Sequence, residues 1–273
     1  MSVAKTSKMS TGKEKSGRYL LAVIFLQGPE IAQKLLDLFR PHQLPDDPEP
    51  DFWCTILAIG RRLKDAIGRV VAADKVLFAA NAALEAARRV RDEKAVILSQ
   101  QIQGLRQACA GLIINCSVQQ MGFDQRTAQD PVPLVIQAER VADHLRGHEA
   151  TADGRLFEGD PFDPKAYASA VEKSAAALRT ALDDVAAARR LAEKVMLEKQ
   201  AVTKEYDDLF LHGARTFESY CRLAGKKELA DRIRPSEERP GETEEEPPEV
   251  SDPVVEPPAQ PVVAGKEDAA SPN

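Results

Sequence analysis

The chain has 273 residues, which is enough for one or two domains. Only 5% of the residues are aromatic and 29% are charged, a balance that is typical of long helices and coiled coils and unfavourable to a thick globular core. The formal net charge of −6 is concentrated in residues 236–273, which hold eleven acidic and two basic side chains. The remainder is weakly basic, and a net charge of +3 over that length is too small to indicate nucleic-acid binding.

Cysteine spacing and the amino-terminal segment bear on the cellular compartment. The four cysteines form no C-x-x-C pair, so reduced, buried thiols in a cytoplasmic protein are the simplest interpretation. Basic residues up to Arg18 precede an apolar run at residues 19–26, an order that loosely resembles a secretory signal. However, residues 27–30 contain no small-x-small cleavage site, and the run is shorter than the ~20 residues that span a bilayer. We therefore expect a cytoplasmic protein whose apolar run belongs to a docked helix.

The first fifty residues are expected to form a polar tail, a helical segment and a loop. Residues 1–17 are polar and rich in lysine, so we expect them to be disordered. Helix is predicted over residues 18–40, with an interruption at Gly28-Pro29, because proline removes a hydrogen-bond donor and disfavours helix at the residue before it. Four prolines between residues 41 and 50 predict a loop.

Residues 52–121, the first long arm, carry the strongest periodic signal in the sequence. The arm contains no proline, and Asp51 is placed to cap its first turn. Leucine or valine recurs at seven-residue intervals with alanine three residues later, which predicts a coiled-coil seam. The seam residues are Leu63, Ala66, Val70, Ala73, Leu77, Ala80, Leu84, Ala87, Leu98, Leu105 and Leu112. A continuous helix here would be ~100 Å long, and its weak points would be its four glycines, because each costs about 1 kcal/mol relative to alanine.

A connector and a second long arm follow. The connector at residues 122–163 is rich in turn residues and contains one short predicted helix at about residues 133–147. The second arm, residues 164–224, keeps helical spacing of its apolar residues throughout. Pro164 suits the first turn of a helix, and Gly225 suits the left-handed conformation that often ends one.

The last part of the chain is predicted to change from helix to disordered tail. A short amphipathic helix is predicted at residues 226–234, which completes a helical body over residues 18–234. Residues 235–273 are rich in glutamate and proline, so they cannot bury enough apolar surface to offset the entropy of ordering. Residues 258–261 form a P-x-x-P sequence, which can present a polyproline II ligand but is common in disordered spacers.

Two histidines have a spacing that is compatible with a metal site. His144 and His148 stand at i and i+4 of the connector helix, where two imidazoles can bind one metal ion. A zinc-protease motif needs glutamate directly after the first histidine, but Leu145 is there. We expect two solvated histidines. The sequence also contains no phosphate-binding loop or nucleophile motif, so we expect no cofactor, no evident small-molecule substrate and no enzymatic activity.

These patterns favour an all-α fold, namely a long antiparallel helical hairpin or coiled-coil-like bundle with disordered termini. The alternative architecture breaks each arm near its glycines and folds as a compact four-helix bundle. For function, we expect a non-enzymatic structural or adaptor protein that acts through helical self-association or packing on a partner helix, with a flexible acidic tail. The alternatives are a peripheral membrane-surface protein that uses its basic tail and residues 19–26 and, less favoured, a nucleic-acid-associated helical protein.

Overall fold

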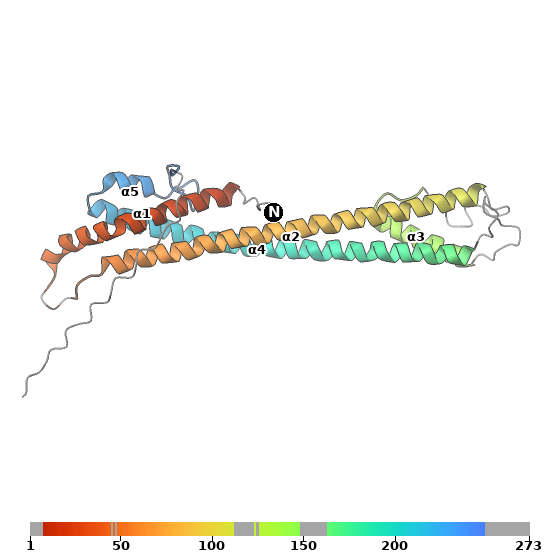
Figure 1. Cartoon of the computed structure of the whole chain (residues 1–273), viewed down its shortest axis with the longest axis horizontal. Coiled ribbons are helices and arrows are strands. Elements are labelled where there is room, and N and C mark those ends of the chain that lie inside the picture. Colours follow the sequence, from red (N-terminus) through yellow and green to blue (C-terminus); the bar gives the residue numbers. More distant parts are fainter. Residues whose placement is uncertain are drawn as a thin grey trace, which may run out of the picture. The chain divides into compact units, whose positions relative to one another are not determined.

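The computed structural model describes residues 8–44, 46, 48–111, 123, 126–147 and 163–248. The helices are α1 (Lys8–Phe39), the short 3-10 helix η1 (Arg40–His42), α2 (Phe52–Gly111), α3 (Pro131–Gly147), α4 (Pro164–Leu223) and α5 (Lys227–Ile233). The long helices α2 and α4 pack antiparallel (Figure 1), which confirms the predicted all-α hairpin. The chain divides into two compact units: unit 1 contains the residues up to Lys75 and from Lys199 onward, and unit 2 runs from Val76 to Glu198.

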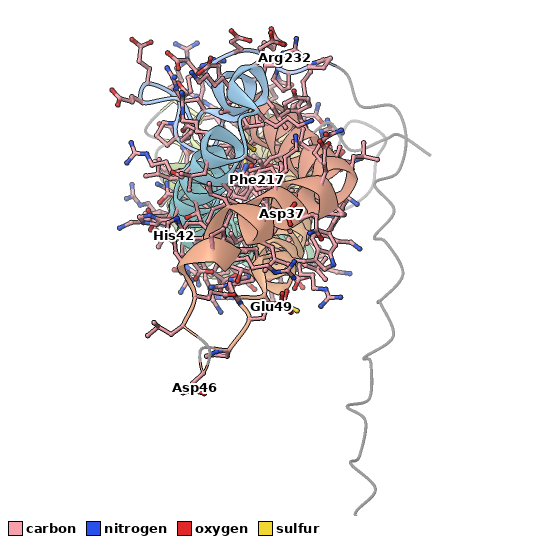
Figure 2. All side chains as sticks on the ribbon, turned by 90° about the vertical axis from the view of Figure 1, so that its left-hand side faces the viewer. Asp37, His42, Asp46, Glu49, Phe217 and Arg232 are labelled. Atoms are coloured by element: carbon pink, nitrogen blue, oxygen red, sulfur yellow. The ribbon has the colours of Figure 1, made fainter. Side chains whose placement is uncertain are left out.

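In unit 1, α1 packs its apolar face against α2 and α4. The apolar run predicted as a docking face contributes buried side chains such as Leu20 and Ile24 to the same cluster as Tyr206 and Phe217. Figure 2 shows Phe217 among the helices of this unit, whereas Asp46 lies at its edge in the loop between α1 and α2. This core is thicker than the composition predicts, because α1, α2, α4 and α5 share one cluster and aromatic residues such as Tyr206, Phe210 and Phe217 gather in it.

Two glycines let α1 approach α2 closely. A Cβ atom on Gly60 would lie 2.9 Å from Ile24, and one on Gly28 would lie 2.7 Å from the Trp53 ring. Both distances are too short for a carbon–carbon contact, so these residues mark positions where the helices meet. Neither glycine breaks its helix, because the packing gained outweighs the weak helix propensity of glycine.

The structure corrects the predicted boundaries of the first helix. Helix α1 begins at Lys8 rather than near Arg18, and it continues through Pro29 without a break. Apolar residues on both sides of the proline, including Phe25 and Ile31, are buried in the core of unit 1. Their burial holds the helix together across a position where proline costs about 3 kcal/mol.

In unit 2, α3 covers part of the α2–α4 pair. Its buried side chains, among them Leu134, Val141 and Leu145, join one cluster with Leu98 of α2 and Leu178 of α4. Helix α3 begins two residues before the predicted start of the connector helix. Around Ala80 of α2 and Ala192 of α4 the pair has a much thinner core, which consists of Ala80, Ala192 and Val195 with half-buried Leu77 and Leu84 packed against them.

The ends of the long helices are set by residues that are close in sequence. The Asp51 carboxylate accepts a hydrogen bond from the backbone N–H of Cys54 at 2.8 Å, so it caps α2 as predicted. Asp163 caps α4 in the same manner through Lys165 and Ala166. Gly225 has a φ of 78°, the left-handed conformation expected after the last turn of α4.

Helix α2 runs without interruption from Phe52 to Gly111, through Gly60, Gly68 and Gly104. The alternative architecture, in which this arm breaks near its glycines, therefore does not hold for α2. The predicted end of the arm at Met121 lies outside the described residues.

Part of the predicted acidic tail is folded. Residues 235–248, which we call the strap, turn back on themselves after α5. Pro235 and Thr243 form an antiparallel bridge, and the backbone N–H of Ser236 donates to the carbonyl of Glu242 at 2.9 Å. Gly241 supplies the positive φ of 81° that the turn requires. The prediction of disorder from composition is wrong for the strap, because the residues that hold it, such as Lys13 and Tyr206, lie elsewhere in the chain.

Candidate interaction surface

The residues predicted for the α2 seam are placed as follows. Six are buried: Leu63, Ala66, Val70, Ala80, Leu98 and Leu105. Four are half-buried: Ala73, Leu77, Leu84 and Ala87. Leu112 lies outside the described residues. The first seam residues therefore belong to the core of unit 1, and Leu98 and Leu105 belong to the core shared with α3 in unit 2. Between these two cores, where the small cluster around Ala80 contains only α2 and α4, most seam residues are half-buried.

A buried ion pair interrupts the apolar seam within unit 1. Lys199 of α4 donates to the carboxylate of Asp74 on α2, and both side chains are at most 10% exposed. A charge in such a position is costly unless its partner is present. The pair therefore favours one register of the two helices, as single polar residues do in coiled coils.

A second buried polar cluster holds the strap against the first turns of α1. The Lys13 ammonium forms an ion pair with Asp207 and donates to the Pro240 carbonyl at 2.7 Å. The Tyr206 hydroxyl lies 2.8 Å from the carbonyl oxygen of Lys13 and 3.1 Å from that of Gly241. The cluster explains why a lysine of the polar amino-terminal segment is buried and helical.

Burial governs the ionisation of this cluster. It raises the pKa of Tyr206 well above its ordinary value, and the nearby carboxylates of Asp207 and Glu242 act in the same direction. Burial also raises the pKa of Asp207, although the hydrogen bond from Lys13 opposes that shift. Tyr206 therefore stays protonated as a donor to the two carbonyl groups.

One flank of the α2–α4 pair in unit 1 is a charged groove of about 650 Å³. Its wall includes the ion pair between Arg69 and Glu205, which joins the two helices directly. Charges of both signs line it, so it resembles the solvated flank of a coiled coil more than a site for an apolar partner.

The long helices in unit 2 expose several large apolar side chains. Eight of them are between 45% and 66% exposed: Val76, Phe78, Val90, Val96, Ile97, Leu191, Met196 and Leu197. The seam prediction missed these residues because it sought a single buried face. The signal that could have found them is a second series at seven-residue intervals, Val76, Ala83, Val90 and Ile97.

The histidines predicted as weak metal candidates are not brought together within the described residues. His144 is exposed near the end of α3, and His148 lies outside the described part of the chain. Among the described residues, no three histidine, cysteine, aspartate or glutamate side chains gather in a way that could hold a metal ion.

The apolar run of the membrane-surface alternative lies mostly in the core of unit 1. Leu20, Leu21, Val23, Ile24 and Phe25 are buried, so insertion into a membrane surface would require this part of α1 to leave its core. None of the described helices is long and apolar enough to cross a membrane.

No family model matches the chain, and no curated protein or solved structure is significantly similar to it.

Proposed function

We propose that this chain is a non-enzymatic structural or adaptor protein that acts by packing its long helices against another helix. The observation that supports this proposal is the set of eight exposed large apolar side chains on α2 and α4 in unit 2. Scattered apolar residues are normal on a protein surface, but a concentration of them along one element is a feature of interaction sites.

The chemistry of this surface fits a helical partner. Long helices present apolar side chains in rows, and a partner helix binds such rows through its own residues at i, i+3, i+4 and i+7. The core around Ala80, Ala192 and Val195 is thin, so α2 and α4 bury little apolar surface against each other there, and a partner helix would add to the buried area. The acidic, proline-rich residues 249–273 would offer a second contact segment, a proposal that rests on their sequence alone.

Site-specific photo-cross-linking tests the proposal. A photoreactive phenylalanine analogue replaces exposed Ile97 in one variant of the full chain and exposed Arg88 in a second, matched variant. Both variants are irradiated as pure protein and in an extract of the source cells. We expect a protein–protein cross-link from position 97 and little from position 88. The proposal fails if position 97 yields no protein product under either condition.

A further inference from the structure

The last turns of α1 extend past the start of α2. Ile24 lies against Gly60 and Gly28 lies against Trp53, so the two helices run antiparallel. Trp53 is the second residue of α2, whereas α1 continues for eleven residues beyond Gly28 to Phe39. This length corresponds to about 16 Å of helix. The end of α1 therefore lies beyond the part that α2 can cover.

This last part of α1 is apolar on the side that the helix buries elsewhere. Ile31 and Leu35 are fully buried in the core of unit 1. Leu38 follows Ile31 by seven residues and Phe39 follows Leu35 by four, so both continue the same helical face. Nevertheless, Leu38 is 46% exposed and Phe39 is 39% exposed. They are exposed because the last turn extends past its cover, and not because they point away from the core.

Aromatic rings connect this turn to the ends of α2 and α4. The ring centroids of Phe39 and Phe52 are 5.5 Å apart, and those of Phe52 and Tyr220 are 6.2 Å apart. Phe52 and Tyr220 are half-buried at the margin of the core of unit 1. Leu223 follows Tyr220 by three residues on α4 and is 53% exposed. We call these residues the end patch: Leu38, Phe39, Phe52, Tyr220 and Leu223. Aromatic side chains gathered at a surface are a feature of protein interaction sites.

The surroundings of the end patch are negatively charged. Residues 37–51 hold five acidic side chains and one arginine, a formal net charge of −4. Figure 2 looks onto this end of unit 1 and shows Asp37 on α1 together with Asp46 and Glu49 of the following loop, all three of them exposed. Arg40 is already paired with Glu49 at 2.8 Å. The loop therefore offers carboxylates rather than cations to anything that covers the patch.

The helix ends add to this negative charge. Helices α1 and α4 both end here, and the carboxyl-terminal end of a helix carries a partial negative charge that favours lysine or arginine nearby. The start of α2, which has the opposite sign, is capped by Asp51. Arg222 and Lys226 at the end of α4 are already held in ion pairs. A cationic group would therefore complement this end of unit 1.

Two terminal segments of the chain do not fit the end patch. Residues 1–7 precede the opposite end of α1, about 46 Å away, and seven residues span at most ~25 Å. Residues 249–273 carry five acidic side chains and one basic side chain, so they have the same sign of charge as the surroundings of the patch. We therefore look to a second molecule for the occupant.

We propose that the end patch binds a basic amphipathic helix of another protein. Such a helix places apolar side chains at i, i+3 and i+4 against Leu38, Phe39 and Leu223, and its lysines or arginines beside the carboxylates of residues 37–51. Charge complementarity favours this partner over an acidic segment and over an anionic membrane surface. The inference goes beyond the proposed function, which concerns α2 and α4 in unit 2.

A synthetic peptide serves as the probe. It has about 16 residues, enough to form a helix on binding, with leucines on one face, lysines on the other and a fluorescein label. A second peptide carries glutamate in place of every lysine. Fluorescence anisotropy measures the dissociation constant of each peptide with the full chain. We expect the lysine peptide to bind at least tenfold more tightly than the glutamate peptide.

Two lysine substitutions on α1 make the test specific for the end patch. Leu38→Lys places a cation in the patch, whereas Leu26→Lys places one on the outer face of the same helix, where Leu26 is 77% exposed. Circular dichroism checks that the helix content of both variants is unchanged. We expect Leu38→Lys to weaken binding of the lysine peptide at least tenfold and Leu26→Lys to change it less than twofold. The fluorescence of Trp53, the only tryptophan in the chain, should change when the wild type binds the peptide.

Several outcomes overturn the inference. No binding of the lysine peptide to the wild type does so, and equal binding to the two variants does so because the peptide then binds elsewhere. Equal binding of the two peptides removes the role of charge. Sedimentation with phosphatidylcholine vesicles, or a wild-type dimer in sedimentation equilibrium, assigns the patch to lipid or to a second copy if Leu38→Lys abolishes it and Leu26→Lys does not. None of these results bears on the cross-link at position 97, so the proposed function is tested separately.

Discussion

The position of Lys13 depends on distant parts of the chain. Its ammonium is buried between Asp207 of α4 and the Pro240 carbonyl of the strap. Lys15, two residues away, forms a comparable ion pair with Glu246 at 3.0 Å, but that carboxylate is 79% exposed. The two lysines therefore differ chiefly in burial, which makes them a matched pair for measuring what burial contributes.

We expect Lys13→Ala to lower the free energy of unfolding by about 2 kcal/mol, because it removes the hydrogen-bonded partner of the half-buried Asp207 carboxylate and of the Pro240 carbonyl. Lys15→Ala should cost less than about 1 kcal/mol, as is usual for exposed ion pairs. Urea denaturation followed by circular dichroism measures both. Equal losses in the two variants would show that the strap contact does not depend on the buried pair.

Cys221 predicts how stability depends on alkaline pH. Burial raises the pKa of its thiol to about 12, whereas the thiol of an unfolded chain ionises near ~8.5. Because the folded pKa is raised, the contribution to stability is complete below the unfolded pKa and is lost as the pH rises toward 12. We expect a loss of about 2 kcal/mol from this residue between pH 7.5 and pH 10.

Unfolding in urea at these two pH values, for the wild type and for Cys221→Ala, measures this contribution. The variant is less stable at pH 7.5 because it lacks a buried side chain, so the informative quantity is the change with pH. That change should be smaller in the variant, and the part that remains is expected from Tyr206, whose pKa is also raised by burial. An identical change in both proteins contradicts the prediction.

At the scale of the elements, the ion pair of Asp74 and Lys199 is expected to fix the register in which α2 packs against α4. Asp74→Ala should destabilise the fold by about 3 kcal/mol, since it removes the carboxylate of a buried ion pair. The double variant Asp74→Leu/Lys199→Leu should recover most of that loss, because apolar residues of similar volume suit a buried seam. Thermal unfolding measures this comparison, and a double variant less stable than the single one would refute it.

Sequence could predict those parts of the elements that have local causes. The cap at Asp51, the turn at Gly225 and the seven-residue seam are readable because each depends on residues within one or two helical turns. The start of α1 is not readable, since Lys13 is held by Asp207, 194 residues away. Its passage through Pro29 is not readable either, because it depends on the burial of Phe25 and Ile31 in the core of unit 1. The exposed series of Val76, Ala83, Val90 and Ile97 is hard to read for another reason: alanine suits both exposed and buried helix positions, so Ala83 does not distinguish an exposed face from a buried one.

At the scale of the whole molecule, the strap connects the last described residues to the first. We expect truncation after Arg234 to destabilise the start of α1, because Lys13 and Tyr206 lose the backbone partners that the strap provides. Hydrogen exchange of the backbone amides in residues 8–17 should then be at least tenfold faster. Truncation after residue 248 is the control and should leave that exchange unchanged. Equal exchange in both truncations would show that the strap does not support α1.

The division of unit 1 between the two ends of the sequence has a consequence for protein synthesis. Unit 2 is one continuous stretch and leaves the ribosome complete, whereas α1 emerges first and must wait for the second half of α4. At typical rates of translation, the 194 residues between Lys13 and Asp207 take roughly 10 to 40 s to make. During that interval the apolar run at residues 19–26 has only α2 to cover it. Helix α1 is therefore expected to need chaperone protection until the second half of α4 has been made.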